Sequence, residues 1–301
     1  MFIQGEMKMY LDELYKKNDF TLSFEIFPFK KWSNKKIYEM LFELSKLNPD
    51  FISITYGAGG TKRGLATLDI ASVIKDEYNI EPMIHLTGIN SSKEEIDEIL
   101  DEVKRRDIKN ILALRGDINK DINKKIEFEY AKDLTKYIKS KNKEIVIAGA
   151  CYPQGHSVNS NIDEEIEHLK QKIEAGAKFL ITQLFFENER FYEFKDKLVK
   201  KNINIEVIPG IIPVTNKKQL NKIISLSNAS VPKDLLRILN KYEDNKQALK
   251  EAGTIYTSKQ IIDLLSYKIK GIHLYTLNNH EITKKIKDNI DPLIKLNSKI
   301  I

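Results

Sequence analysis

Short apolar runs alternate with amphipathic helical patterns along the whole chain. Most of the runs are apolar at successive positions, as expected for parallel strands that are covered by helices. The predicted strands lie at residues 21–27, 50–57, 81–87, 109–116, 144–150, 178–185, 204–210 and 271–277. Eight βα units in 301 residues predict an α/β fold of the (β/α)₈ barrel type, with a doubly wound sheet as the alternative.

The segments between the predicted strands have helical spacing. In residues 91–106 the apolar positions share one face, and serines at 91 and 92 precede glutamates at 94 and 95 in the pattern of a capping box. Residues 161–176 carry a second apolar stripe. Residues 1–20 predict an N-terminal helical extension. Residues 232–270 predict additional helical structure before the last strand. With no linker or repeat, we expect one barrel domain over residues 1–301.

Polar residues close or follow six successive predicted strands. Neighbouring members are 30 to 35 residues apart, which is close to one βα unit. If the chain forms a barrel, all six face the mouth at the carboxyl ends of the strands, where barrel enzymes carry their chemistry. The six residues are Glu25, Thr55, His85, Asp117, Tyr152 and Gln183.

Glu25 lies among apolar neighbours in the sequence "LSFEIFPF". An ionised carboxylate in such surroundings is costly unless it is paired, and desolvation raises a carboxyl pKa toward neutral. This environment suits a general acid. The alternative is a structural ion pair between Glu25 and a lysine from the barrel floor.

Two of the other strand-end residues are ambiguous on their own. Asp117 ends the run "ALRGD" and is either a turn cap or a second carboxylate of the site, with a protonation state that differs from that of Glu25. His85 is either a core histidine or a ligand contact. It lacks two further ligands at metal spacing, so we expect no metal site.

The remaining candidates suit a planar organic ligand. Tyr152 and His156 in "CYPQGH" either pack against such a ligand or shape their loop. The Gln183 amide has both a donor and an acceptor, which suits a pterin or a nicotinamide carboxamide. Lys172 is a solvated lysine unless an anionic group runs from the barrel mouth toward its helix. Cys151 is interpreted as a packing residue, because no flanking charge would lower its pKa.

The stretch "TYGAGGTKRG" at residues 55–64 resembles a phosphate-binding loop at first sight. It fails the dinucleotide fingerprint because Lys62 stands where the third glycine is required. It fails the Walker A pattern because Lys62 and Arg63 stand where Gly and Lys are required. We therefore interpret residues 55–64 as a glycine-rich turn whose backbone can approach a ligand closely.

Composition narrows the class of protein. The net charge of +6 comes from 49 basic and 43 acidic residues, and the lysines are scattered beside glutamates on polar helix faces. We therefore expect no nucleic-acid partner. No stretch has the length of a membrane span, and the N-terminus lacks the apolar core of a signal peptide. The single cysteine excludes an internal disulfide, and we expect a cytoplasmic protein.

Several of these motifs together resemble those of the methylenetetrahydrofolate reductase family, in the same order and from about residue 20 to 285. The motifs are "SFEIFPF", "ITYGAGGTKR", "HLTG", "ALRGD", "CYPQGH", "AGAKFLITQLFF", "IPGIIPVTN" and "LYTLN". The resemblance implies a (β/α)₈ barrel that binds FAD and reduces 5,10-methylenetetrahydrofolate to 5-methyltetrahydrofolate. Hydride would pass from NADH or NADPH through the flavin by a ping-pong mechanism. It also implies a homo-oligomer.

The resemblance assigns roles residue by residue. Glu25 resembles the acid that protonates the folate and opens its five-membered ring to an iminium, and Asp117 resembles the carboxylate that contacts both flavin and pterin. Thr55 resembles a nicotinamide contact. The residues that resemble cofactor contacts are Thr55, Tyr56, Ala58, His85, Arg115, Gly116, Asp117, Ala131, Tyr152, His156, Glu165 and Lys172. Those that resemble substrate contacts are Asp117, Gln183, Gln219, Tyr275 and Asn279.

The chain departs from the family pattern at a few positions. Gln171 stands where a basic residue is expected beside Lys172, Ile223 where an aromatic residue commonly borders the folate, and Asn279 where an arginine is expected. The loop around His156 also differs from the family pattern, and together with the missing arginine it leaves room for a flavin-bearing subunit that takes electrons from a partner protein. A separate alternative is a flavin-free folate-binding barrel that acts in methyl transfer.

Overall fold

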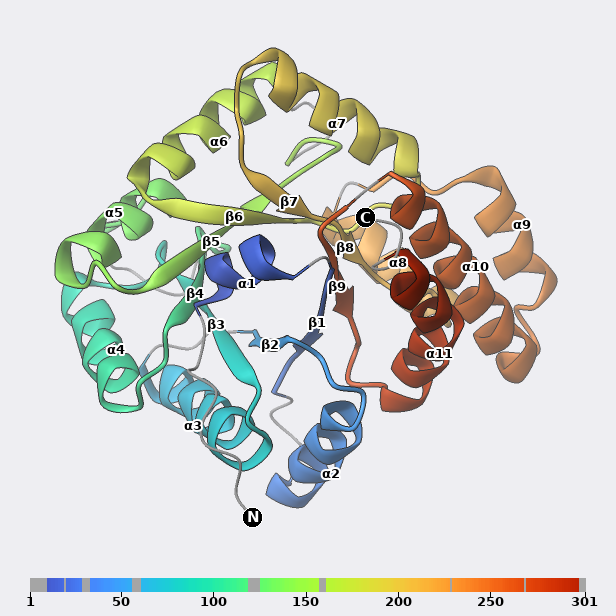
Figure 1. The fold of residues 1–301 in the computed structure, drawn as a ribbon, viewed down its shortest axis with the longest axis horizontal. Helices are drawn as coiled ribbons and strands as arrows, with labels where there is room; N and C mark the ends of the chain where they lie inside the picture. The colour runs from blue at the N-terminus through green and yellow to red at the C-terminus, as the bar shows by residue number, and fades with distance from the viewer. Residues whose placement is uncertain are drawn as a thin grey trace.

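The computed structural model describes residues 10–18, 20–28, 33–55, 61–118, 125–156, 161–227, 229–267 and 269–297. Within these residues nine parallel strands form one sheet in the order β7-β6-β5-β4-β3-β2-β1-β9-β8. Helices surround the strands on the outside (Figure 1). The predicted barrel class is therefore confirmed.

The strands agree closely with the eight predicted runs, except that the seventh run forms two short strands. They are β1 (Thr21–Ile26), β2 (Phe51–Ile54), β3 (Glu81–Thr87), β4 (Asn110–Leu114), β5 (Val146–Cys151), β6 (Ala177–Thr182), β7 (Glu206–Ile208), β8 (Gly210–Ile211) and β9 (Gly271–Tyr275).

The helices of the described residues include the N-terminal helix and the extra helices before the last strand. They are α1 (Leu11–Lys17), α2 (Asn34–Ser45), α3 (Thr61–Tyr78), α4 (Lys93–Arg105), α5 (Ala131–Lys141), α6 (Ile162–Ala175), α7 (Asn188–Lys200), α8 (Lys217–Ser227), α9 (Lys233–Lys241), α10 (Lys246–Ser266) and α11 (His280–Asn297). The predicted capping box is present at α4, where Ser92 and Glu95 bond each other's backbone N–H.

The barrel closes through the short segment of residues 206–211. Strand β7 pairs with β6, whereas β8 pairs with β9 on the opposite side. Pro209 separates the two strands, and it has no N–H to donate to a ladder. Its carbonyl oxygen instead accepts a bond from His273 N at 3.0 Å. One segment thus joins the two edges of the sheet.

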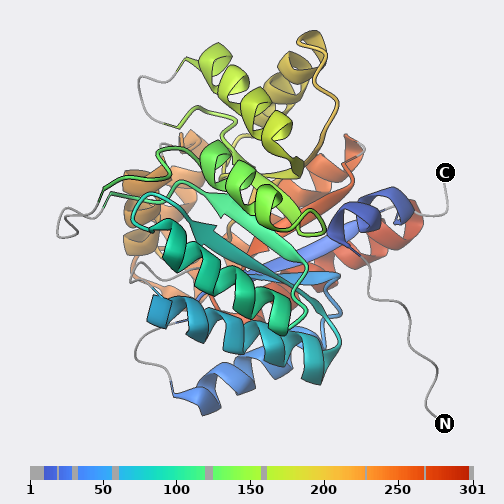
Figure 2. The same ribbon diagram turned by 90° about the vertical axis from the view of Figure 1, so that its left-hand side faces the viewer.

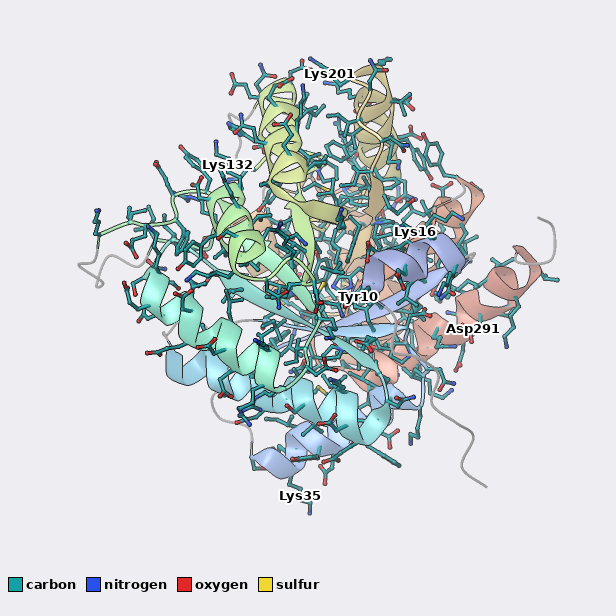
Figure 3. All side chains as sticks on the ribbon, turned by 60° about the vertical axis from the view of Figure 1, so that its left-hand side comes forward. Tyr10, Lys16, Lys35, Lys132, Lys201 and Asp291 are labelled. Carbon is teal, nitrogen blue, oxygen red and sulfur yellow. The ribbon has the colours of Figure 1, made fainter. Side chains whose placement is uncertain are left out.

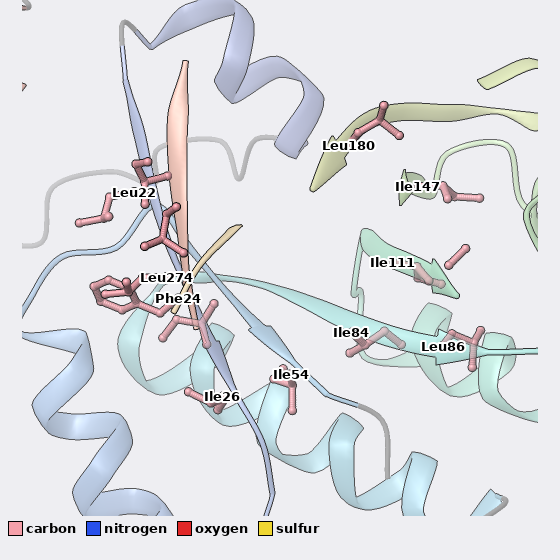
Figure 4. Close-up of a cluster of buried hydrophobic side chains, with 14 of the residues drawn as sticks. Leu22, Phe24, Ile26, Ile54, Ile84, Leu86, Ile111, Ile147, Leu180 and Leu274 are labelled. Carbon is pink, nitrogen blue, oxygen red and sulfur yellow. The ribbon is translucent and has the colours of Figure 1, made fainter. Parts of the chain in front are cut away.

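The larger hydrophobic core lies between the strands and the ring of helices. Alternate residues of β1, namely Leu22, Phe24 and Ile26, belong to this core together with Ile54 of β2 and Leu274 of β9 (Figure 4). Because successive side chains of a strand point to opposite faces, the residues between them point into the barrel.

The lower part of the barrel interior is filled by a second apolar cluster, which α1 covers. Leu11 and Leu14 of α1 pack with Phe51, Met83 and Phe179 from the strands. Leu11 N also donates a hydrogen bond to Asn110 Oδ1 at 3.2 Å, at the start of β4. Helix α1 therefore closes the amino-terminal end of the barrel, and Figure 2 shows it on the side away from the loops that follow β3 and β4. Among the described residues, the end of the barrel interior that α1 and this cluster do not fill is the carboxyl end.

Candidate active site

Two adjoining cavities open at the carboxyl ends of the strands. The central cavity has a volume of about 400 Å³ and lies over the barrel interior, and the side cavity of about 430 Å³ lies over α5 and α6. The two share Arg115, Tyr152 and His156 in their walls. An elongated ligand can therefore extend from one cavity into the other.

All six polar residues that were identified at strand ends line the central cavity. They are Glu25, Thr55, His85, Asp117, Tyr152 and Gln183. The spacing of about one βα unit thus brings side chains from six different strand ends to one place. Tyr275, which the family resemblance suggested as a substrate contact, lines the same cavity.

Glu25 faces imidazoles rather than the apolar residues beside it in the sequence. Its side chain is 16% exposed, and Oε2 lies 3.6 Å from His85 Nε2 and 3.9 Å from His273 Nε2. Phe24 and Ile26 belong to the outer core, on the opposite face of β1. The apolar surroundings expected from "LSFEIFPF" are therefore wrong for these two residues, because strand residues alternate between faces.

His85 is a neutral imidazole at physiological pH. Burial lowers its pKa from the usual 6.5 to about 4, and this outweighs the opposing effect of Glu25, while His273 lowers it further. The Nε2 atom is buried and has no hydrogen-bond partner among the described residues. A neutral histidine beside Glu25 can accept or donate one hydrogen bond to a bound ligand without adding charge.

This shift predicts how stability depends on pH. The unfolded chain binds a proton at His85 below about pH 6.5, whereas the folded chain does so only near pH 4, so the free energy of unfolding falls as pH falls through this window. Within this window His85 contributes up to about 1.4 kcal/mol per pH unit to the slope of the free energy of unfolding against pH. Urea unfolding of the wild type and of His85→Gln at pH 4 to 7 should show a shallower pH slope for the variant. Equal slopes would contradict the shift.

His273 is a site residue that the sequence analysis missed. It is fully buried one layer below the cavity, with Nδ1 2.8 Å from Ser23 Oγ and Nε2 3.2 Å from Ser53 Oγ. The two serines hold the ring next to Glu25. The signal was present in "GIHLYTL", because His273 lies two positions before Tyr275 and therefore on the same inward face. Its position in the middle of the strand, and not at the end, sets it apart from the six strand-end residues.

A tight loop carries Asp117 to the cavity. Gly116 has a φ of +81°, and a Cβ at this position would lie 2.9 Å from Thr87 Cβ, so a side chain does not fit. Asn90 Nδ2 donates a hydrogen bond of 2.6 Å to Asp117 O and ties this loop to the loop after β3. The Asp117 carboxylate itself is exposed.

Tyr275 and Gln183 form the opposite wall. The Tyr275 hydroxyl donates a hydrogen bond of 2.7 Å to Thr182 O, and burial, together with the charge of Glu25, raises its pKa well above the usual value. Tyr275 therefore stays protonated. Gln183 N donates to Cys151 O at 2.7 Å, and Gln183 Oε1 accepts from Leu184 N at 3.0 Å. Gln183 lines the cavity, and its amide nitrogen is a donor that a ligand there can use.

The side cavity contains most of the other residues predicted to contact the cofactor. They are Arg115, Ala131, Tyr152, His156, Glu165 and Lys172. Lys172 Nζ donates a bond of 2.9 Å to Ala150 O and lies 5.6 Å from the centre of the Tyr152 ring. Burial lowers the pKa of Lys172, and the nearby charge of Glu165 offsets this cost of desolvating the ammonium only in part. A bound anion would relieve this cost.

Some predicted residues are not brought together with these. Tyr56 and Ala58 lie outside the described residues. Neither Gln219 nor Asn279 is among the described residues that line the two cavities. Gln219 lies in the first turn of α8, and Asn279 Oδ1 accepts a bond from Ile282 N at the start of α11. Their roles in binding substrate stay predictions.

Other kinds of site find little support in the described part of the chain. No cluster of three or more His, Cys, Asp or Glu side chains there is arranged to hold a metal ion. Cys151 is buried in the outer core, and desolvation raises the pKa of its thiol to about 12. A thiol that stays protonated agrees with a packing residue and not with a nucleophile. Among the described helices, none combines the length and apolar character of a membrane span.

A parallel barrel with a carboxylate and imidazoles at the carboxyl ends of its strands belongs to the class of (β/α)-barrel enzymes. Sequence comparison then identifies the group within this class. The chain belongs to the methylenetetrahydrofolate reductase family, whose sequence profile matches residues 10–291. It is accordingly an oxidoreductase of this family.

Individual relatives support this membership over most of the chain. The 5,10-methylenetetrahydrofolate reductase of Buchnera aphidicola subsp. Baizongia pistaciae is 40% identical over 87% of this chain and 88% of its own length. The enzyme of the same name from Escherichia coli K12 is 33% identical over 88% of this chain and 89% of its own.

A solved structure shows the same fold at low identity. A Clostridium thermocellum protein, described as binding two copies of 5-methyl-5,6,7,8-tetrahydrofolic acid, matches with a TM-score of 0.63 at 15% identity, covering 96% of this chain and all of that chain. At this identity the likeness speaks for the fold alone.

Proposed function

We propose that the chain reduces 5,10-methylenetetrahydrofolate to 5-methyltetrahydrofolate with NADH or NADPH, using bound FAD. The observation that carries the proposal is the central cavity, where Glu25 faces His85 and is joined by Asp117 and Gln183. The membership of the reductase family gives the substrate class. Two substrates that react in turn at one cavity suit a ping-pong mechanism.

The residues present fit FAD. Two cavities that share Arg115, Tyr152 and His156 suit a ligand with a flavin at one end and a nucleotide at the other. The half-buried Lys172 and the guanidinium of Arg115 would contact the diphosphate on the side of the flavin. When bound, FAD supplies a two-electron carrier that accepts hydride from the nicotinamide and delivers it to the folate.

Glu25 would act as the general acid for the folate. In its protonated form it donates the carboxyl proton to the ring nitrogen that leaves, so that the C–N bond opens and an iminium remains on the other nitrogen. His85 stays neutral beside it and so adds no positive charge next to the iminium. His273, held by Ser23 and Ser53, lies 3.9 Å from the Glu25 carboxyl and forms the floor beneath it.

Asp117 and Gln183 would orient the pterin. The exposed Asp117 carboxylate can accept bonds from ring N–H groups, and its negative charge stabilises a cationic folate intermediate. The Gln183 amide nitrogen can donate to a ring carbonyl. Tyr275, which is bonded to Thr182 O, closes the wall without taking part in proton transfer.

A visible absorption spectrum of the purified protein tests the proposal. We expect a yellow protein that bleaches with anaerobic NADH or NADPH and recovers its colour with methylenetetrahydrofolate. A yellow protein that neither nucleotide bleaches would point to a protein electron donor. A colourless protein that refuses added FAD would overturn the proposal.

A further inference from the structure

The side cavity has an excess of positive charge. Arg115, Lys132 and Lys172 line it, and Glu165 is the one carboxylate among its described lining residues. Glu165 Oε1 already accepts a hydrogen bond from His156 N at 2.9 Å. Three cations against one engaged carboxylate favour an anionic ligand with more than one charge.

Lys132 is held in place at the rim of this cavity. It lies in the first turn of α5, and its Nζ donates a hydrogen bond of 2.6 Å to Gln171 Oε1 of α6. The same Nζ lies 5.4 Å from the centre of the Tyr130 ring. In Figure 3, Lys132 lies toward the end of the barrel opposite Tyr10 and Lys16, which mark α1. The contact with a neutral amide orients the ammonium and leaves its charge uncompensated.

The cations differ in their distance from the central cavity. Arg115 lines both cavities, and Lys172 bonds Ala150 O, a group of the central cavity wall. Lys132 lines the side cavity but not the central cavity. The same holds for Tyr130 and His168, whose rings are stacked with centroids 6.5 Å apart. A ligand that enters from the central cavity therefore meets Arg115 and Lys172 first and Lys132 next, beside a pair of aromatic rings.

We propose that Lys132, oriented by Gln171, binds the outer phosphate of the bound dinucleotide, the one attached to the adenosine. This assignment rests on the proposed function, which supplies FAD as the dinucleotide. Arg115 and Lys172 serve the inner phosphate, which the flavin mononucleotide also possesses. The Lys132–Gln171 pair is then a determinant of preference for FAD over FMN.

Flavin affinity of the Lys132→Met variant tests the assignment. We expect the dissociation constant of FAD, followed by the fluorescence of released flavin when the holoenzyme is diluted, to rise about tenfold through loss of one charge-assisted bond. The dissociation constant of FMN, measured by titration of the flavin-depleted protein, should change by less than about twofold because FMN lacks the outer phosphate. Lys136→Met is the matched control, since Lys136 is exposed one turn along α5 and does not line the cavity.

A rescue variant separates charge from folding. Lys132→Met combined with Gln171→Lys places an ammonium at the neighbouring position and should recover most of the FAD affinity. Unchanged FAD affinity in Lys132→Met, or an equal loss for FAD and FMN, would overturn the assignment while the proposed function stands. A wild-type protein that binds no flavin would overturn both.

Discussion

Replacing Glu25 with glutamine is expected to slow folate reduction by about 10²- to 10⁴-fold, the usual contribution of a general acid. The amide keeps the volume of the side chain and can still lie beside His85, but it has no acidic proton to give to the leaving nitrogen. Reduction of the flavin by NADH needs no such proton transfer to a substrate, so its rate should change by less than about threefold. Rapid mixing with each substrate alone, followed by flavin absorbance, measures the two half-reactions separately.

Glu206→Gln provides the matched control for this substitution. Glu206 begins β7 at the amino-terminal end of the barrel, and burial raises the pKa of its carboxyl, so the exchange removes a partly buried glutamate far from the cavity. Both half-reactions should keep their wild-type rates in this variant. If Glu25→Gln slowed both half-reactions equally, Glu25 would hold the site together rather than act as the acid.

The position of the active site could be predicted because it depends on a regular repeat. Each βα unit brings the chain back to the same end of the barrel, so polar residues at intervals of about one unit must converge there. Glu25 of β1 and Gln183, which follows β6, are five strands apart in the sequence and line one cavity for this reason. No motif was needed for this step, although the identity of the ligands came from the family resemblance.

The neighbours of each site residue could not be predicted in the same way. The environment of Glu25 depends on which face of β1 it occupies and on what the adjacent strands present there. The register pairs Glu25 with Tyr275 on one side and with Ser53 on the other, and it brings His273 beside Ser23. A sequence read one strand at a time does not contain this cross-strand information.

Contacts between helices could not be predicted from the sequence either. Gln171 stands where the family pattern led us to expect a basic residue beside Lys172. In the structure Lys132 reaches the same place from α5, with its Nζ 2.6 Å from Gln171 Oε1. The packing of α5 against α6 determines this pairing, and 39 residues separate its two members in the sequence.

Replacing Gly253 with alanine is expected to destabilise the fold by about 3 kcal/mol or more. Gly253 is buried within α10, and a Cβ there would lie 1.8 Å from Val214 O and 2.8 Å from Val214 C. Both atoms are backbone, so α10 or the segment after β8 would have to move. Alanine is favoured over glycine inside a helix by only about 1 kcal/mol, which does not offset such a clash.

Urea unfolding of Gly253→Ala beside Gly149→Ala measures this effect against a matched control. A Cβ on Gly149 would meet Leu180 Cδ2 at 3.0 Å, and this methyl group is the far end of a side chain that can rotate away. We therefore expect a loss of less than about 1 kcal/mol for Gly149→Ala. Because the displaced Val214 segment leads into α8, which carries Gln219, the folate affinity of Gly253→Ala should fall as well. Equal stability of the two variants would show that α10 does not depend on this close backbone approach.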